Sequence, residues 1–382
     1  MSMKKEVKGK HKQEYLNRLR KARVVGNIPP VYPNGWFCIA ESRQLKPKQI
    51  LPVFFLGQQL TLFRSETGKV YLVDSYCPHL GANFNTGGRV VDDNCIQCPF
   101  HGWIFNGETG ACTRIPYNLN YSIPQKASVA VWPVIERNKH IYVWYHCDGL
   151  NPEWNIPEID EIADGTWQYR GRTEHEINSH IQDLPENGAD IAHLNYLHLT
   201  GVNKGNDITK IDLTNPQPVI KHVWNGRWEQ QAKPDQHIAV MYLEQVMTIF
   251  GISIPLTHSY LKAIQIGPGI VHMMFNFGWL GRGVVFQHIT PEEPLFQRAR
   301  FTMYANIPKI YSNMFLIFEA FHFERDIHIW NHKRYVKPPL LVAKDGPILK
   351  HRRWFDQFYT DNSPRLKMDG TLTNHVKSIY DW

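Results

Sequence analysis

The stretches that decide the fold are Cys-Pro-His at residues 77–79 and Cys-Pro-Phe-His at residues 98–101. They are separated by 18 residues, and each pairs a thiol with an imidazole two or three residues later. Glycines follow both stretches, among them Gly81 and Gly102, so two backbone loops can pack closely around a small inorganic core. The four side chains can therefore hold either a [2Fe–2S] cluster or a structural zinc ion.

The glycine-rich flanks favour iron over zinc. A cluster with two Cys on one iron and two His on the other is of the Rieske type, whose imidazoles raise the reduction potential above that of an all-Cys cluster. We therefore predict that Cys77, His79, Cys98 and His101 bind a [2Fe–2S] cluster, with a Cys₂His₂ zinc site as the alternative.

Length and composition indicate a packed protein of more than one domain. The 382 residues are 43% hydrophobic and 13% aromatic, which is typical of a globular chain with two or three sizeable cores. Two of the six Cys are assigned to the cluster, so a disulfide framework is not expected and a reducing compartment is favoured. Cys95 and Cys112 are close to the cluster motifs in sequence and are expected to be small buried side chains.

The net charge of +7 is concentrated at the N-terminus, where residues 1–23 contain nine Lys or Arg and two acids. Such a segment can lie against anionic lipid or remain a solvated tail. Only one aromatic residue, Tyr15, lies among these charges and the rest of the chain has no basic surplus, so nucleic acid is not an expected partner. No signal peptide or transmembrane helix is visible, because the longest apolar stretch, 238–256, is broken by Glu244 and Gln245.

Strand and helix patterns divide the chain into three parts. Residues 1–34 form a basic segment with a short helix over 13–23, and residues 35–147 form a small antiparallel β domain with the cluster motifs at its loop tips. Residues 148–382 begin with a Pro-rich and acidic linker. Further along, the pattern predicts a strand over 167–180, a helix over 182–200, long strands over 219–305 and a helix over 310–332. The fold class is α+β, with a long antiparallel sheet that curls around a helix in a helix-grip arrangement.

A second metal site is predicted in the C-terminal part. His193 and His198 are five residues apart, about 140° around an ideal helix, so both reach one metal only if the helix is distorted, as at a π-bulge. Asp190 is three residues before His193 on the same face. Two imidazoles and one distant carboxylate form the facial triad of non-haem Fe(II) oxygenases. The carboxylate candidate is Asp326, with Glu324 as its competitor.

Other histidines and the apolar strands receive no catalytic assignment. The histidines without a motif are taken as structural or pocket residues: His175, His180, His258, His322 and His328. The strands over 219–305 are rich in large apolar side chains that could line a substrate pocket: Met241, Met247, Met273, Met274, Phe275 and Phe277. Ordinary sheet core is the more common role of any one of them, so no substrate-binding residue is assigned.

With both metal motifs placed, residues 24–382 resemble the Rieske non-haem iron oxygenases. Rieske proteins of respiratory and photosynthetic complexes carry a disulfide that clamps the two cluster loops. Ala82 and Phe100 occupy the corresponding positions here, so the oxygenase type is favoured. The stretches 29–36, 76–83, 98–103, 153–158, 345–348 and 352–359 are similar to the cholesterol 7-desaturases of the Neverland group. The chain departs from that group in showing no hydrophobic membrane segment near its N-terminus.

The resemblance implies an O₂-dependent enzyme that converts cholesterol to 7-dehydrocholesterol. It implies a mononuclear Fe(II), electrons from NAD(P)H through a separate reductase, and a head-to-tail homotrimer in which Asp190 bridges a cluster histidine of one subunit to His193 of the next. It also implies association with the endoplasmic reticulum membrane on the cytoplasmic side. The alternatives are a steroid ring hydroxylase of the 3-ketosteroid 9α-hydroxylase type and, in another class, an electron-carrier Rieske protein without chemistry of its own.

Overall fold

The computed structural model describes Glu14, Arg18 and residues 28–199, 205–210, 220–254, 258–367 and 369–373. The helix predicted over 13–23 lies outside these residues, apart from Glu14 and Arg18, which are both in helical conformation. None of the described helices is both long enough and apolar enough to span a bilayer.

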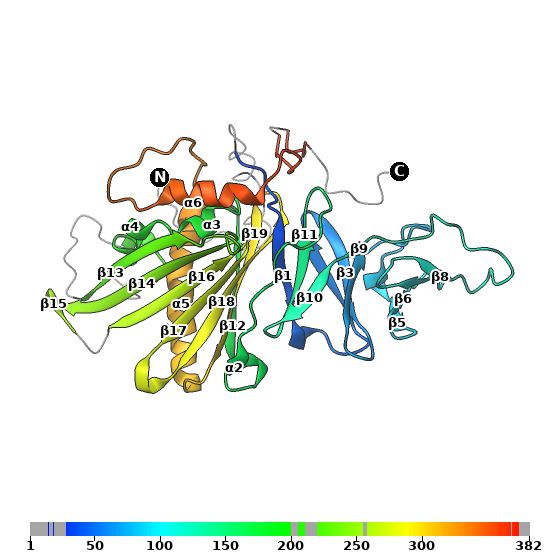
Figure 1. The fold of residues 1–382 in the computed structure, drawn as a ribbon, viewed down its shortest axis with the longest axis horizontal. Helices are drawn as coiled ribbons and strands as arrows, with labels where there is room; N and C mark the ends of the chain where they lie inside the picture. Colours follow the sequence, from blue (N-terminus) through cyan, green and yellow to red (C-terminus); the bar gives the residue numbers. More distant parts are fainter. Residues whose placement is uncertain are drawn as a thin grey trace.

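The N-terminal domain consists of three small antiparallel sheets (Figure 1). The first has the order β1-β11-β10 and is formed by β1 (Gly35–Glu41), β10 (Val134–Arg137) and β11 (His140–Tyr145). The second has the order β2-β3-β4-β9 and is formed by β2 (Ile50–Phe55), β3 (Gln58–Arg64), β4 (Val70–Asp74) and β9 (Val131–Trp132). The third is formed in sequence order by β5 (Arg89–Val91), β6 (Cys95–Gln97), β7 (Ile104–Asn106) and β8 (Cys112–Arg114).

The third sheet carries the second cluster motif in the connection between β6 and β7, and the first motif follows β4. This sheet forms one extreme end of the molecule (Figure 1). The predicted boundary between residues 147 and 148 falls in the turn that follows β11.

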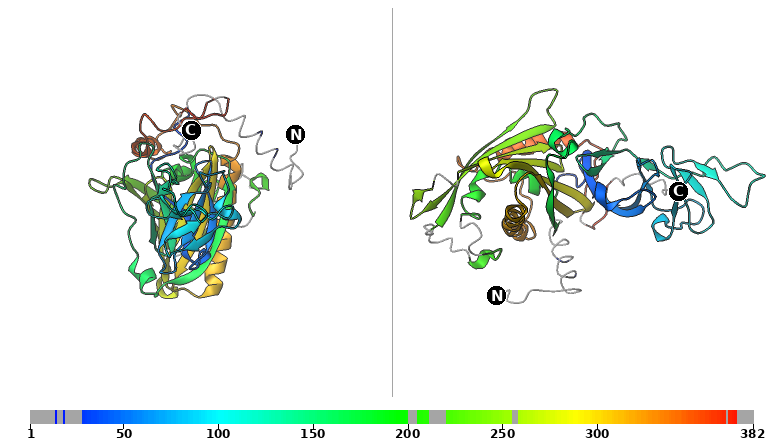
Figure 2. Two further views of the ribbon diagram at one scale, coloured as in Figure 1. Left: turned by 90° about the vertical axis from the view of Figure 1, so that its right-hand side faces the viewer. Right: turned by 90° about the horizontal axis from the view of Figure 1, so that it is seen from below.

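The C-terminal domain is built on one eight-stranded antiparallel sheet of order β12-β19-β18-β17-β16-β14-β13, with β15 paired to β14. Its strands are β12 (Gln168–Ile177), β13 (Ile220–Gln230), β14 (Ile238–Ile249), β15 (Ile252–Ser253), β16 (Ser259–Ile266), β17 (Ile270–Asn276), β18 (Arg282–Glu293) and β19 (Phe296–Ala305). The sheet arches over the long helix α5 (Lys309–Trp330), as the view from below in Figure 2 shows. The predicted α+β fold with a sheet curled around a helix is confirmed.

Aromatic packing and one glycine hold α5 against the concave face of the sheet. Phe323 lies edge-on to Phe301 of β19 at a ring separation of 4.6 Å, and Phe315 stacks on Phe275 of β17 at 5.6 Å. A Cβ atom on Gly171 of β12 would lie 2.8 Å from a methyl carbon of Leu316. A side chain at this position would therefore force Leu316 to move, and the φ of 151° also favours glycine here.

The sequence predicts one continuous helix over residues 182–200, and this prediction is wrong. The structure has two short helices there, α3 (Asp183–Glu186) and α4 (Ile191–Leu194), followed by a turn over residues 195–199. Gly188 falls in the break, and the Asp190 side chain accepts a hydrogen bond from the His193 N–H and so begins α4 as its N-cap. Two further helices are α2 (Asp160–Ala163), within the predicted linker, and α6 (Ile348–Phe355).

The two domains share a continuous hydrophobic core. The hydroxyl of Thr290 in β18 donates to the Cys38 carbonyl of β1 at 2.6 Å, and the N–H of Leu56 donates to the Pro291 carbonyl at 2.8 Å. These contacts fix the orientation of the cluster-bearing domain relative to the sheet.

Candidate functional site

The two cluster loops have the same backbone hydrogen bonds. In each loop the Cys N–H donates to the carbonyl five positions later, and the Gly four positions after the Cys donates back to the Cys carbonyl. These bonds are Cys77 to Ala82, Gly81 to Cys77, Cys98 to Trp103 and Gly102 to Cys98. Gly81 and Gly102 both adopt a left-handed conformation, with φ of 71° and 72°. The sequence similarity of the two motifs is therefore matched by a repeated loop structure.

The loops bring the two thiols together and the two imidazoles together. Cys77 and Cys98 are 2% and 3% exposed and lie within hydrogen-bonding reach of each other. The His79 and His101 rings are 4.7 Å apart. Burial, reinforced by the neighbouring Cys98, raises the pKa of Cys77 to about 12.

This donor set fits an iron–sulfur cluster. Two buried thiols side by side ionise together only when a metal ion supplies the compensating charge. The Nδ1 atom of His79 is buried and has no hydrogen-bond partner among the described residues. Trp103 donates its indole N–H to the Tyr117 hydroxyl at 2.8 Å. The indole, held in this way, stacks on the His79 imidazole at 4.6 Å and fixes the orientation of that imidazole.

A second group of metal-ligand side chains forms between α5 and the α3–α4 segment. Ligand atoms of His193, His198 and Asp326 all lie within 4.8 Å of one another. The His198 Nε2 atom is 3.1 Å from Asp326 Oδ1, and both side chains are buried. The Nδ1 atom of His198 is buried without a partner among the described residues. Two imidazoles and one carboxylate with free space beside them match the ligand set of a mononuclear non-haem iron.

The break after α4 allows the two histidines to meet. Because the helix ends at Leu194, the turn carries His198 back towards His193, and no π-bulge is needed. Asn195 anchors this turn to β13 by accepting from the Trp224 N–H at 2.9 Å and donating to the Trp224 carbonyl at 2.8 Å. The fully buried Arg325 donates to the Leu197 carbonyl at 3.1 Å. Sequence reasoning missed Asn195 and Arg325, since both act through partners distant in sequence.

Of the two acids considered on α5, the structure brings Asp326 to the histidines. The Glu324 carboxylate lies 2.6 Å from Nδ1 of His175 on β12, on another side of the helix. Asp190 lies beside His193, with its carboxylate 3.9 Å from the imidazole Nδ1 and its side chain 32% exposed. The Asp190 carboxylate therefore lies next to His193 and is also accessible from solvent.

A buried ionic network supports the segment that carries the histidines. Arg352 of α6 binds Glu186 of α3 through two hydrogen bonds of 2.6 and 3.0 Å, and Lys333 lies 2.9 Å from Asp183. Gly346 approaches the backbone of the same segment so closely that a Cβ atom there would lie 2.4 Å from the Ala189 carbonyl oxygen. The contacts hold α3 and α4 against the C-terminal part of the chain.

Comparison with known proteins identifies the family. Residues 35–133 match the Rieske [2Fe-2S] domain, and residues 143–359 match the 3-Ketosteroid 9alpha-hydroxylase C-terminal domain. The chain is 59% identical to the cholesterol 7-desaturase of Caenorhabditis elegans over 99% of its own length and 89% of that protein. It belongs to the Rieske oxygenases of the cholesterol 7-desaturase group.

A second member of the 7-desaturase group is also similar to this chain, and more distant oxygenases share part of its sequence or its fold. The cholesterol 7-desaturase nvd of Xenopus laevis is 45% identical over 94% of this chain and 79% of that protein. A 3-ketosteroid-9-alpha-monooxygenase oxygenase component from Rhodococcus rhodochrous is 27% identical over 88% of the chain and 86% of that protein. Dicamba monooxygenase bound to dicamba shares the fold, with a TM-score of 0.63 over 86% of this chain and 98% of that one, at 18% identity.

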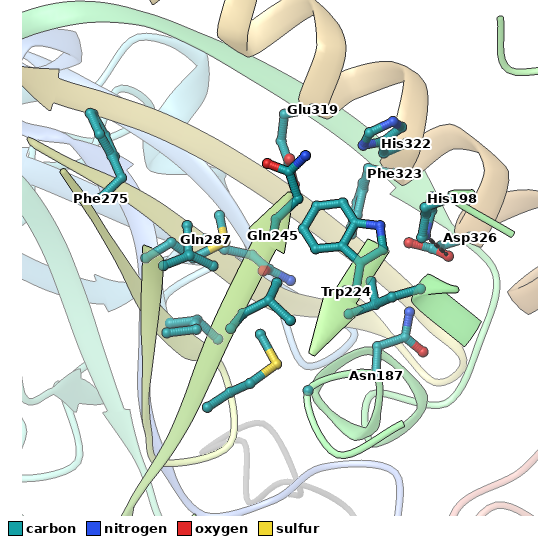
Figure 3. A pocket seen from close by; sticks show the side chains of 18 of the residues that line it. Asn187, His198, Trp224, Gln245, Phe275, Gln287, Glu319, His322, Phe323 and Asp326 are labelled. Atoms are coloured by element: carbon teal, nitrogen blue, oxygen red, sulfur yellow. Dashed lines mark hydrogen bonds and ion pairs between the residues drawn. The ribbon is translucent and has the colours of Figure 1, made fainter. Parts of the chain in front are cut away.

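His193, His198 and Asp326 are called the metal group below. In this Rieske oxygenase they lie at the wall of a cavity of about 400 Å³ between α5 and the concave face of the sheet (Figure 3). Its walls are mainly apolar, and its size lies within the range of small-molecule sites. Of the apolar side chains named from the sequence, four line it: Met241, Met273, Phe275 and Phe277. Met274 is not among its lining residues, because neighbouring positions of a strand face opposite sides of the sheet and Met273 faces the cavity. Met247 does not line it either, although it shares the face of β14 that carries Met241, because it lies nearer the end of that strand. His322 lies at the wall near the metal group.

Proposed function

We propose that this chain is the oxygenase that converts cholesterol to 7-dehydrocholesterol with O₂ and two electrons. The observation that carries the proposal is the convergence of His193, His198 and Asp326 at the wall of an apolar cavity. The 59% identity to a cholesterol 7-desaturase supports this reaction over the 3-ketosteroid 9α-hydroxylase alternative, whose relative is 27% identical. An electron carrier would have no use for a second group of metal ligands in a cavity.

Seven side chains are proposed to hold the two iron centres. Cys77, His79, Cys98 and His101 would hold the [2Fe–2S] cluster, and His193, His198 and Asp326 the single Fe(II). The chemistry these groups supply when bound is one-electron transfer and the activation of O₂. The chain itself orients the sterol, excludes water through the apolar walls, and keeps the two imidazoles and the carboxylate in place.

The positions of the two sites support electron transfer between copies of the chain. The third sheet, which carries the second cluster loop, lies at the opposite end of the molecule from α4 (Figure 1). We therefore propose a head-to-tail homotrimer in which the cluster of one subunit faces the metal group of the next. The partly exposed Asp190, beside His193, would connect them by accepting a hydrogen bond from a cluster histidine of the neighbour.

The electron source and the location of the enzyme are part of the proposal. A separate reductase would deliver electrons from NAD(P)H, because the sequence contains no Gly-rich dinucleotide motif. Association with the endoplasmic reticulum membrane, through the basic residues 1–23, would place the enzyme near its sterol substrate.

Sterol analysis of cells that express the chain with a reductase tests the function. Fed with cholesterol, these cells should accumulate 7-dehydrocholesterol, and the His193→Ala variant should lose the product while it retains the cluster's absorption spectrum. His258→Ala is the matched control, because this histidine pairs with Glu244 at a partly exposed position away from the metal group. Undiminished product from His193→Ala would overturn the proposal.

A further inference from the structure

Most polar side chains that line the cavity are already engaged with a neighbour. Gln245 lies 2.7 Å from the His222 imidazole and accepts from the Ser259 hydroxyl at 2.9 Å. Gln265 lies between Trp228 and His351, at 3.4 and 3.3 Å. The hydrogen-bonding groups of these side chains are paired with their neighbours and are therefore less available to a ligand.

Glu319 differs from them because it has no such partner. It projects from α5 towards the cavity (Figure 3) and makes no hydrogen bond or ion pair with any residue that the structure describes. Burial raises the pKa of its carboxyl group, and the nearby Asp326 carboxylate raises it further, while His198 acts in the opposite direction. A carboxyl group without a partner in an apolar cavity is costly to maintain, and such groups are common at ligand sites.

The position of Glu319 relative to the metal group is set by the helix. Glu319 precedes Asp326 by seven residues, which is two turns and about 10 Å along the axis, so the two side chains lie on the same face of α5. His322 and Phe323 lie between them and also line the cavity. A ligand whose reacting atoms lie at the metal group can reach Glu319 only with a polar group displaced from those atoms along α5, towards the start of the helix.

Cholesterol has this distribution of polarity. Its single polar group is the hydroxyl at C3 of the A ring, and the A ring is fused to the B ring from which hydrogen is removed. When C7 and C8 face the metal group, the hydroxyl projects away from it by the width of the neighbouring ring. A hydroxyl donor matches a carboxyl oxygen, which accepts a hydrogen bond whether the group is ionised or protonated.

We propose that Glu319 binds the sterol hydroxyl and thereby fixes which carbons of the B ring meet the metal group. This inference rests on the proposed sterol function and makes Glu319 a specificity residue of the same cavity. Gln287 on β18 is the other candidate, since its amide also lines the cavity without a hydrogen bond to a described residue. Glu319 is favoured because its distance from Asp326 along α5 is defined and because its carboxyl oxygens can accept a hydrogen bond from the sterol hydroxyl.

Binding of two sterols to the iron-loaded enzyme without O₂ tests the proposal. The ligands are cholesterol and its analogue without the hydroxyl, cholest-5-ene, both delivered from cyclodextrin. Wild type should bind cholesterol roughly three- to a hundredfold more tightly, the range from one hydrogen bond to a neutral group to one to a charged group. Glu319→Leu should bind both sterols alike, and Glu319→Gln should retain a reduced preference. Met273→Leu is the matched control and should change the affinity for both sterols equally, because Met273 lines the cavity without a polar group.

The outcomes separate the two proposals. Full preference for cholesterol in Glu319→Leu, or its loss in Gln287→Leu instead, would overturn the role of Glu319 while the sterol function stands. Equal binding of the two sterols by the wild-type enzyme would also overturn the role of Glu319 and leave the sterol function standing. If the preference depends on Glu319 but wild type yields no 7-dehydrocholesterol, hydroxyl recognition stands and the proposed reaction fails. If Glu319→Leu does not fold, the reduced preference of Glu319→Gln decides the matter.

Discussion

Asp326 and Glu324 show how two acids close in sequence take different partners on one helix. Two residues correspond to about 200° around the axis, so their side chains leave α5 on nearly opposite sides. Asp326 meets His198 at 3.1 Å, whereas Glu324 meets His175 at 2.6 Å. From the sequence, one of these two acids was expected to be the third ligand of the mononuclear iron. The choice depends on which face of α5 is turned towards the histidines, and the sheet that packs against the helix determines this.

The iron content of two alanine variants tests the difference. Asp326→Ala removes the only carboxylate of the proposed triad, so the variant should lose the mononuclear iron and keep the two cluster irons. Glu324→Ala should keep about three irons per chain, since it removes only a partner of His175. Iron and acid-labile sulfide, measured together per chain, give the result. An Asp326→Ala variant with full iron content would exclude Asp326 as a ligand.

At the scale of elements, the segment over residues 182–200 was the least predictable part of the site. Its spacing of histidines and its composition indicated one distorted helix, whereas the structure has two short helices and a turn. The break depends on local signals, such as Gly188 and the capping Asp190. It also depends on contacts from β13 and α5 that only the fold creates. The runs of alternating residues over 219–305 were predicted well because a strand's period is local.

The Arg352–Glu186 pair provides a test of how α3 and α4 are held. Arg352→Met leaves the buried Glu186 carboxylate without its two-hydrogen-bond partner, so we expect a loss of roughly 3 kcal/mol in the free energy of unfolding. Mononuclear iron should also be released more readily, because the same segment carries both histidines. The adjacent Arg353 is exposed, and Arg353→Met should change stability by less than about 0.5 kcal/mol. Urea unfolding of the two variants that gives equal midpoints would contradict this account.

At the scale of the whole molecule, a group of buried histidines lies where the two domains meet. His140 of β11 is packed edge-on to His288 of β18 at 4.7 Å, and the Tyr142 hydroxyl lies 3.0 Å from His288 Nε2. Burial lowers the pKa of His140 to about 4 and of His272 to about 3, and it lowers the pKa of His288 well below its ordinary value. All three are therefore neutral in the folded enzyme at neutral pH.

These histidines predict a loss of stability in weak acid. Because their folded pKa values lie below the unfolded value of about 6.5, the unfolded chain takes up protons first as the pH falls. Their contribution is complete above pH 6.5 and decreases towards pH 4, by about 1.4 kcal/mol per histidine for each pH unit. His272→Phe, beside Phe286, should reduce this dependence by one proton, whereas the partly exposed His258→Gln should not. Urea unfolding between pH 5 and 7 is the measurement, and identical slopes for His272→Phe and wild type would refute the prediction.

The fate of labelled hydrogen in the product tests the central claim most directly. Cholesterol deuterated at C7 and C8 is incubated with the enzyme, a reductase and heavy-isotope O₂, and the product is analysed by mass spectrometry. The proposed desaturation predicts a product that has lost one deuterium from each of the two carbons and has gained no heavy oxygen. A product that has gained heavy oxygen and kept the deuterium at C8 would show hydroxylation instead and would contradict the proposed desaturation.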